Sequence, residues 1–88
     1  MFEAYLCIGH GAPFTWSLIR THDYDVALEA FAHLVGCGVL DSTSVSAVLR
    51  CRQTTLAIHR FAAEPGTPDN WRGRVHTLST QGNRRARG

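Results

Sequence analysis

Apolar and polar side chains alternate along two stretches near the start of the chain. The alternation covers residues 2–8 and returns over residues 14–21, and a period of two is typical of half-buried strands. The intervening residues 9–13, Gly-His-Gly-Ala-Pro, favour a turn, because glycine permits positive φ and proline interrupts a strand ladder. We therefore predict a β-hairpin over residues 2–21.

The period changes at residue 23. Apolar residues then recur three and four positions apart, as in one stripe of an amphipathic helix. The stripe consists of Tyr24, Ala27, Leu28, Phe31, Leu34 and Val35. Asp23 is suited to cap the first turn, and Gly36 and Gly38 are suited to end the helix. The pattern predicts a helix over residues 24–35.

Two further stretches are rich in strand-forming residues, at 45–51 and 55–61. Joined by residues 52–54, they favour a second hairpin. The spacing of Val45, Val48 and Leu49 also suits a helix over residues 44–52, and this alternative stays open. Residues 64–70 predict a loop, residues 71–80 are compatible with one more strand, and residues 81–88 predict a disordered basic tail.

These elements predict an α+β fold, a two-layer ββαββ sandwich. Its antiparallel sheet has four strands, or five if residues 71–80 contribute one, and the single helix covers one face. We expect residues 1–63 to form the compact domain, residues 64–80 to add a loop and the additional strand, and residues 81–88 to form the tail.

A single helix covers only one face of such a sheet. The opposite face mixes apolar and polar side chains, a composition typical of association surfaces. We expect this face to carry Tyr5, Cys7, Thr15, Ser17, Ile19, Val48, Arg50, Arg52, His59 and Phe61. The predicted partner contacts are Tyr5, Arg50, Arg52, His59 and Phe61, with Trp71, Arg72 and Arg74 at the rim or covering the face.

The charge is unevenly distributed along the 88 residues. The net charge is +2 and all nine basic residues are arginine. Residues 1–63 hold four arginines and five acidic residues, a net charge of −1, whereas residues 64–88 carry +3. A basic tail favours acidic partners, but dedicated nucleic-acid domains are usually more basic throughout.

Three cysteines cannot all pair within one chain, and the first residues are not typical of a signal peptide because Glu3 stands where a basic residue is expected. We therefore expect a reducing, cytoplasmic location. No apolar run approaches the roughly 20 residues of a membrane-spanning helix. We therefore expect no membrane association.

The spacing of Cys7, His10, His33 and Cys37 suggests a zinc site formed by a hairpin and a helix. The helical wheel argues against it. At about 100° per residue, His33 falls roughly 160° and Cys37 roughly 120° from the centre of the apolar stripe. Cys7 also belongs to the face opposite the helix. We predict neither a metal site nor a cofactor.

The pattern favours a non-enzymatic protein-binding module that docks through the helix-free face, either on a separate protein partner or on a second copy of itself as a homodimer. An inhibitor or regulator of a larger host complex, of the kind phages and plasmids encode, is the specific form we favour. The alternative is binding of RNA or single-stranded DNA by the arginine and aromatic side chains of the same face together with the arginine-rich tail. A minor alternative is a small ribonuclease using His59 with Arg50, Arg52 and Tyr5.

Overall fold

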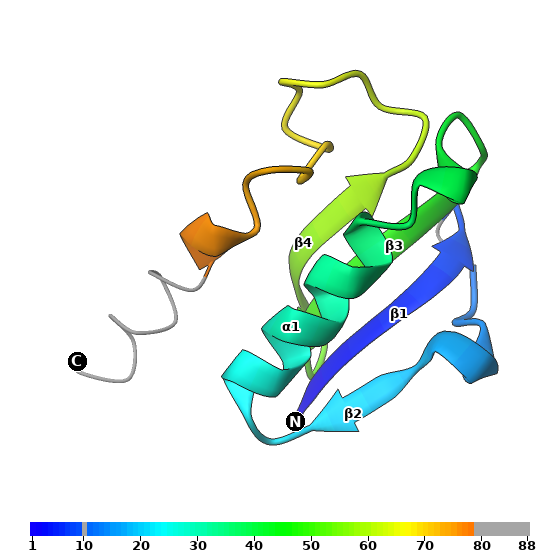
Figure 1. Cartoon of the computed structure of the whole chain (residues 1–88). Helices are drawn as coiled ribbons and strands as arrows, with labels where there is room; N and C mark the ends of the chain where they lie inside the picture. The colour runs from blue at the N-terminus through cyan, green and yellow to red at the C-terminus, as the bar shows by residue number, and fades with distance from the viewer. Residues whose placement is uncertain (10, 79–88) are drawn as a thin grey trace.

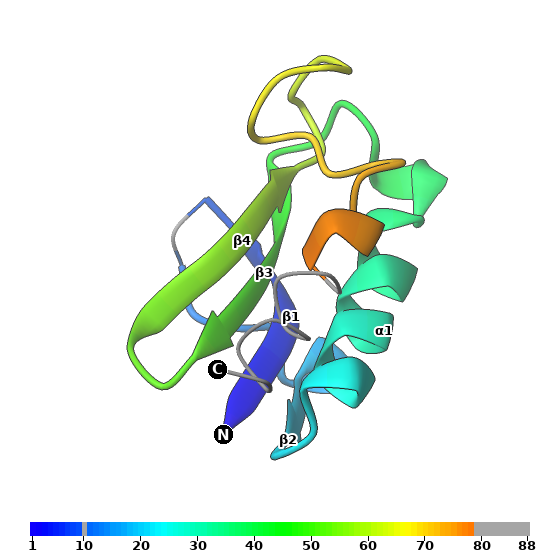
Figure 2. The same cartoon turned by 90° about the vertical axis from the view of Figure 1, so that its left-hand side faces the viewer.

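The computed structural model describes residues 1–9 and 11–78 (Figure 1). The elements, in order, are β1 (Phe2–Ile8), a 3-10 turn η1 (Thr15–Ser17), β2 (Ile19–Thr21), α1 (Tyr24–Val35), η2 (Gly38–Leu40), β3 (Val45–Cys51) and β4 (Thr54–Arg60). The four strands pair antiparallel in the order β2-β1-β3-β4, and α1 packs on one face (Figure 2). The predicted ββαββ sandwich is confirmed.

Helix α1 begins and ends where the sequence predicts. The Asp23 carboxylate accepts hydrogen bonds from the backbone N–H groups of Asp25 (2.9 Å) and Val26 (3.4 Å), which satisfies two of the donors that a helix start leaves unpaired. The apolar stripe faces the sheet and forms the main core together with both central strands. The buried members of this core are Ala4, Leu6, Ala27, Leu28, Phe31, Val35, Ala47, Leu49, Ala57, Phe61 and Leu78.

The second strand is shorter than predicted. Only Ile19–Thr21 pairs with β1, and the preceding residues form the turn η1. The Ser17 hydroxyl accepts a hydrogen bond from the Leu6 N–H (2.9 Å) and donates one to the Phe14 carbonyl oxygen (2.7 Å). A side chain thus replaces the strand backbone as the partner of β1, so the chain can turn here without leaving Leu6 unpaired.

Strands β3 and β4 confirm the second hairpin, and the alternative helix over residues 44–52 is wrong. The hairpin contains an irregularity between Leu49 and Arg50. Arg50 lies opposite Thr55, but Leu49 lies opposite Ala57, so Leu56 is an extra residue on β4. Such a β-bulge moves every later residue of the bulged strand to the other face relative to regular pairing.

The predicted strand over residues 71–80 is wrong for the described part of that segment. Residues 72–75 form turns and residues 76–78 are helical, and the segment lies on the same side of the sheet as α1 (Figure 2). Leu78 joins the main core, and the Tyr24 hydroxyl donates to the Leu78 carbonyl oxygen (2.8 Å). The core therefore extends past residue 63, and the predicted tail, residues 81–88, lies outside the described residues.

Across residues 1–9 and 11–78, no helix has the length and apolar character needed to cross a membrane.

Candidate functional site

The helix-free face contains an ion-pair network at one end. Glu3 accepts hydrogen bonds from the guanidinium groups of Arg50 (2.7 Å) and Arg20 (2.8 Å), and the Arg50 guanidinium lies 5.3 Å from the centre of the Tyr5 ring. The bond from Arg50, ahead of that from Arg20, lowers the pKa of Glu3 even though partial burial opposes the shift. Both arginines already have a carboxylate partner, so a ligand would have to compete with Glu3 for them.

The middle of the same face is largely covered. Tyr5, Cys7 and Val48 form a small buried cluster flanked by Leu18 and Ile58. Burial raises the pKa of both the Tyr5 hydroxyl and the Cys7 thiol. The space left between this cluster and the loop after β1 is a shallow hollow of about 170 Å³. The Tyr5 ring, only 6% exposed, is therefore not placed to stack on a base.

His59 and Phe61 do not lie on the helix-free face, and this part of the face prediction is wrong. Regular pairing of the hairpin would place His59 opposite Ser46. The bulge instead places it opposite Ala47, which faces α1. Phe61 belongs to the main core for the same reason. Ile19 was also expected on the helix-free face, but it pairs with core residue Ala4 and faces the α1 side.

His59 is enclosed by the segment that follows β4. Its Nδ1 accepts a hydrogen bond from the Trp71 N–H (2.9 Å), and its ring meets Phe61 edge-on with centroids 4.7 Å apart. The side chain is 1% exposed, and Nε2 has no partner among the described residues. Burial first, and the positive charge of Arg72 second, lower the pKa of His59, while Asp41 opposes the shift.

Trp71, Arg72 and Arg74 also lie on the α1 side, where they organise the C-terminal segment. Arg72 donates to the Asp41 carboxylate (2.7 Å) and to the Val35 carbonyl oxygen (2.7 Å), so it fastens the segment to the end of α1. Arg74 lies over the Trp71 ring at 4.8 Å, and its guanidinium donates to backbone carbonyl oxygens of residues 67, 68 and 70.

The eight predicted contact residues thus separate into two groups on opposite sides of the sheet. Tyr5 and Arg50 touch each other on the helix-free face, and Arg52 is exposed in the turn between β3 and β4. The other five surround β4 on the α1 side. The arrangement that a ribonuclease would need, with His59 beside Arg50 and Tyr5, is therefore not formed.

The four residues considered for zinc are not gathered either. Cys7 is buried on the helix-free face, and His33 is exposed on α1. His10 lies outside the described residues. Among the described side chains, no three His, Cys, Asp or Glu residues form a cluster that could hold a metal ion.

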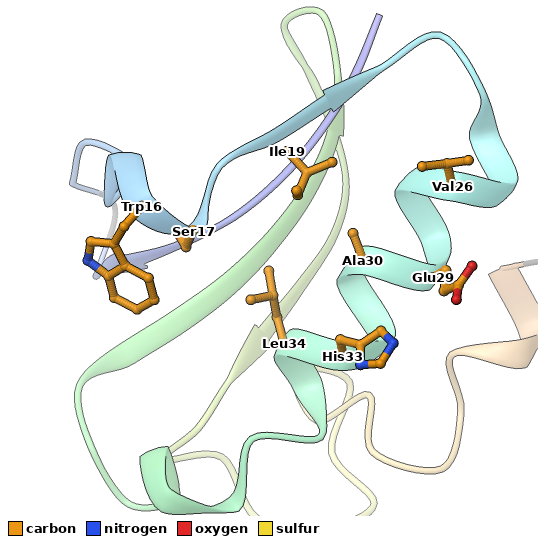
Figure 3. A pocket seen from close by; sticks show the side chains of 8 residues that line it. All are labelled: Trp16, Ser17, Ile19, Val26, Glu29, Ala30, His33 and Leu34. Carbon is orange, nitrogen blue, oxygen red and sulfur yellow. The ribbon is translucent and has the colours of Figure 1, made fainter.

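A different surface gathers exposed apolar side chains, between β2 and α1. Three of the large apolar residues most exposed to solvent, Trp16 (77%), Ile19 (43%) and Val26 (47%), surround one open hollow of about 460 Å³. Trp16 and Ile19 approach it from the β2 side, and Ala30 and Leu34 point toward them from α1 (Figure 3). We call this hollow the β2–α1 groove.

The groove is held open by structure on both sides. The Trp16 ring is stacked on Phe14 with centroids 5.9 Å apart, which supports it in its exposed position. Ser17 anchors the turn η1 to β1 through the Leu6 N–H. On the opposite wall, the side chains stand on a capped helix of 12 residues. Rigid walls reduce the entropy that a surface loses on binding.

The sequence contained a partial signal for this site. Val26 is apolar but lies outside the stripe that α1 turns toward the core, so its exposure follows from the helical period. Trp16 gave no such signal, because the alternating pattern placed it in a strand that the structure replaces with η1.

No family model, curated protein or solved structure matches this chain.

Proposed function

We propose that this domain is a protein-binding module whose docking site is the β2–α1 groove. The observation that carries the proposal is the convergence of Trp16, Ile19 and Val26 on a single open hollow. Soluble domains seldom leave large apolar side chains grouped at the surface unless the group binds a partner. Tryptophan is also among the residues that contribute most to binding at protein interfaces.

The proposed site differs from the face expected from the sequence. The helix-free face offers a partner chiefly arginine side chains, two of which Glu3 already holds. The groove instead combines apolar surface, an exposed aromatic anchor and an adjacent sheet edge. We retain the proposal of a non-enzymatic regulator or inhibitor that docks on a larger complex, with the groove as the surface that docks.

Capture from host lysate with and without nuclease treatment, followed by mass spectrometry and reconstitution using the purified partner, tests this function. Four baits are compared with the wild-type chain: Trp16→Ala, Ile19→Asp, the double variant Arg50→Glu with Arg52→Glu, and Val39→Asp. Val39 is 86% exposed and does not line the groove, so it is the matched control for exposed apolar surface. Circular dichroism verifies that each variant is folded.

We expect one partner to bind the wild type, the control and the double arginine variant, and to be lost from both groove variants. If both groove variants still capture the partner and the double arginine variant does not, the docking site is the helix-free face and not the groove. Loss of the partner on nuclease treatment alone would favour the nucleic-acid alternative.

A further inference from the structure

The outer edge of the sheet beside the groove has open backbone hydrogen-bonding groups. The Arg52 N–H donates to the Met1 carbonyl oxygen (3.2 Å), so the odd-numbered residues of β1 direct their backbone groups to β3. The even-numbered residues therefore bond to β2, through Ile19 and Thr21. It follows that the N–H and C=O of Arg20, between them, point away from the sheet.

We propose that the β2–α1 groove binds an extended polypeptide segment that adds a strand to the outer edge of β2. This deepens the proposed function and rests on it. In an antiparallel addition, one residue of the segment exchanges two hydrogen bonds with Arg20. A helical partner has no unpaired backbone groups along its length and would leave this edge unused.

The geometry of a sheet then fixes where the partner's side chains go. The residues on either side of the one opposite Arg20 lie on the same face as Ile19 and Thr21. That face is the α1 side, where Val26, Ala30 and Leu34 line the hollow (Figure 3). The segment should therefore carry apolar side chains at alternate positions, two residues apart.

The helix wall adds a charge preference. Glu29 lines the groove and Asp25 lies one turn earlier on α1. Neither carboxylate has an ion-pair partner among the described residues. A lysine or arginine next to the apolar positions of the segment would complement them, and such rim charges chiefly affect specificity and the rate of association.

Selection from a displayed library of random peptides provides the probe, and the selected peptide is then synthesised. Arg20→Pro removes the outward N–H, and proline is tolerated on an edge strand where that group faces solvent. Arg20→Ala is the matched control, because it removes the same ion pair with Glu3 but keeps the N–H. Ile19→Asp reports whether the peptide occupies the groove.

We expect the peptide to bind Arg20→Pro about tenfold more weakly than Arg20→Ala, the effect of one lost hydrogen bond. We also expect N-methylation of the peptide backbone to weaken binding at the residue that lies opposite Arg20 and not at its two neighbours. The contrary result is a peptide whose binding is lost in Ile19→Asp, is equally strong in the two Arg20 variants and is equally affected by methylation at every position. That result would overturn strand addition but would leave the docking function of the groove supported.

Two other results bear on the partner. If no selected peptide depends on Ile19, both the strand addition and the groove as a docking site are refuted. If light scattering shows a wild-type dimer that Arg20→Pro dissociates and Arg20→Ala does not, the segment on β2 belongs to a second copy of this chain, and the proposal of a separate partner segment is overturned.

Discussion

Protonation of His59 should destabilise the fold at mildly acidic pH. The neutral ring accepts the Trp71 N–H at Nδ1, so its own proton resides on Nε2. A second proton would turn Nδ1 into a donor facing another donor and would place a charge on a side chain that is 1% exposed. Burial and the neighbouring charge of Arg72 accordingly hold the pKa of His59 below 6.5, against the weaker opposing effect of Asp41.

The direction and the size of this change in the free energy of unfolding follow from proton linkage. The unfolded chain binds a proton at His59 near pH 6.5, while the folded chain resists it, so stability is full above that pH and falls as the pH drops toward the folded pKa. The loss amounts to at most about 1.4 kcal/mol per pH unit. Between about pH 7.5 and about pH 5.5 the free energy of unfolding should therefore fall by up to about 1.4 kcal/mol.

Carboxylates act in a lower range of pH. Glu3 and Asp41 have pKa values below their ordinary 4.5 and 3.8. They contribute stability that is present above those values and lost as the pH falls through the folded pKa. The interval from about pH 7.5 to about pH 5.5 therefore isolates the histidine, because it ends about one pH unit above the ordinary pKa of Glu3.

Urea unfolding at a series of pH values measures the effect. His59→Gln keeps an oxygen that can accept the Trp71 N–H but does not titrate, so its free energy of unfolding should be flat across this interval. His33→Gln, at an exposed position on α1, should keep the wild-type slope. Two results would refute the reasoning: a wild-type protein that is equally stable at both ends of the interval, or a His59→Gln variant whose free energy of unfolding still falls with pH as in the wild type.

Three further substitutions test local contacts by urea unfolding. Asp23→Ala removes the cap of α1 and should cost about 1 kcal/mol, with reduced helical circular dichroism; an unchanged midpoint would contradict the cap. Glu3→Gln weakens both arginine contacts on the helix-free face and should cost about 1–2 kcal/mol at neutral pH, with the difference from wild type shrinking in acid. Tyr24→Phe loses the bond to the Leu78 carbonyl oxygen and should cost about 1 kcal/mol. Hydrogen exchange should then accelerate over residues 75–78, and unchanged protection would show that this bond does not hold the segment.

The helix and the long strands could be predicted because their signals are local. The apolar stripe of α1 identifies the face of the helix that is buried against the sheet, and Asp23 supplies the hydrogen-bond acceptor that the first turn lacks. Strand β1 shows its alternation for the same reason. The second strand was overestimated because alternation in residues 14–21 cannot reveal that the Ser17 hydroxyl bonds to Leu6 in place of a backbone group.

The candidate site was harder to predict, because it depends on pairing between distant residues. One extra residue at the bulge moved His59 and Phe61 from the expected face to the core side. The C-terminal segment then enclosed His59 and drew Trp71, Arg72 and Arg74 with it. No periodicity within residues 54–61 indicates this change, since alternation shows that a strand has two faces but not which of them packs against the helix.

The sequence alone determined the set of elements, their order and the two-layer arrangement. Burial of one side of a helix or strand requires apolar residues at a regular spacing, and that spacing can be read from the sequence. What only the tertiary structure decided was which residues share a surface. Long-range hydrogen bonds and packing determine three features: the bulge between Leu49 and Arg50, the turn at Ser17 and the docking of residues 71–78. Those contacts buried His59 and left Trp16, Ile19 and Val26 together at the surface.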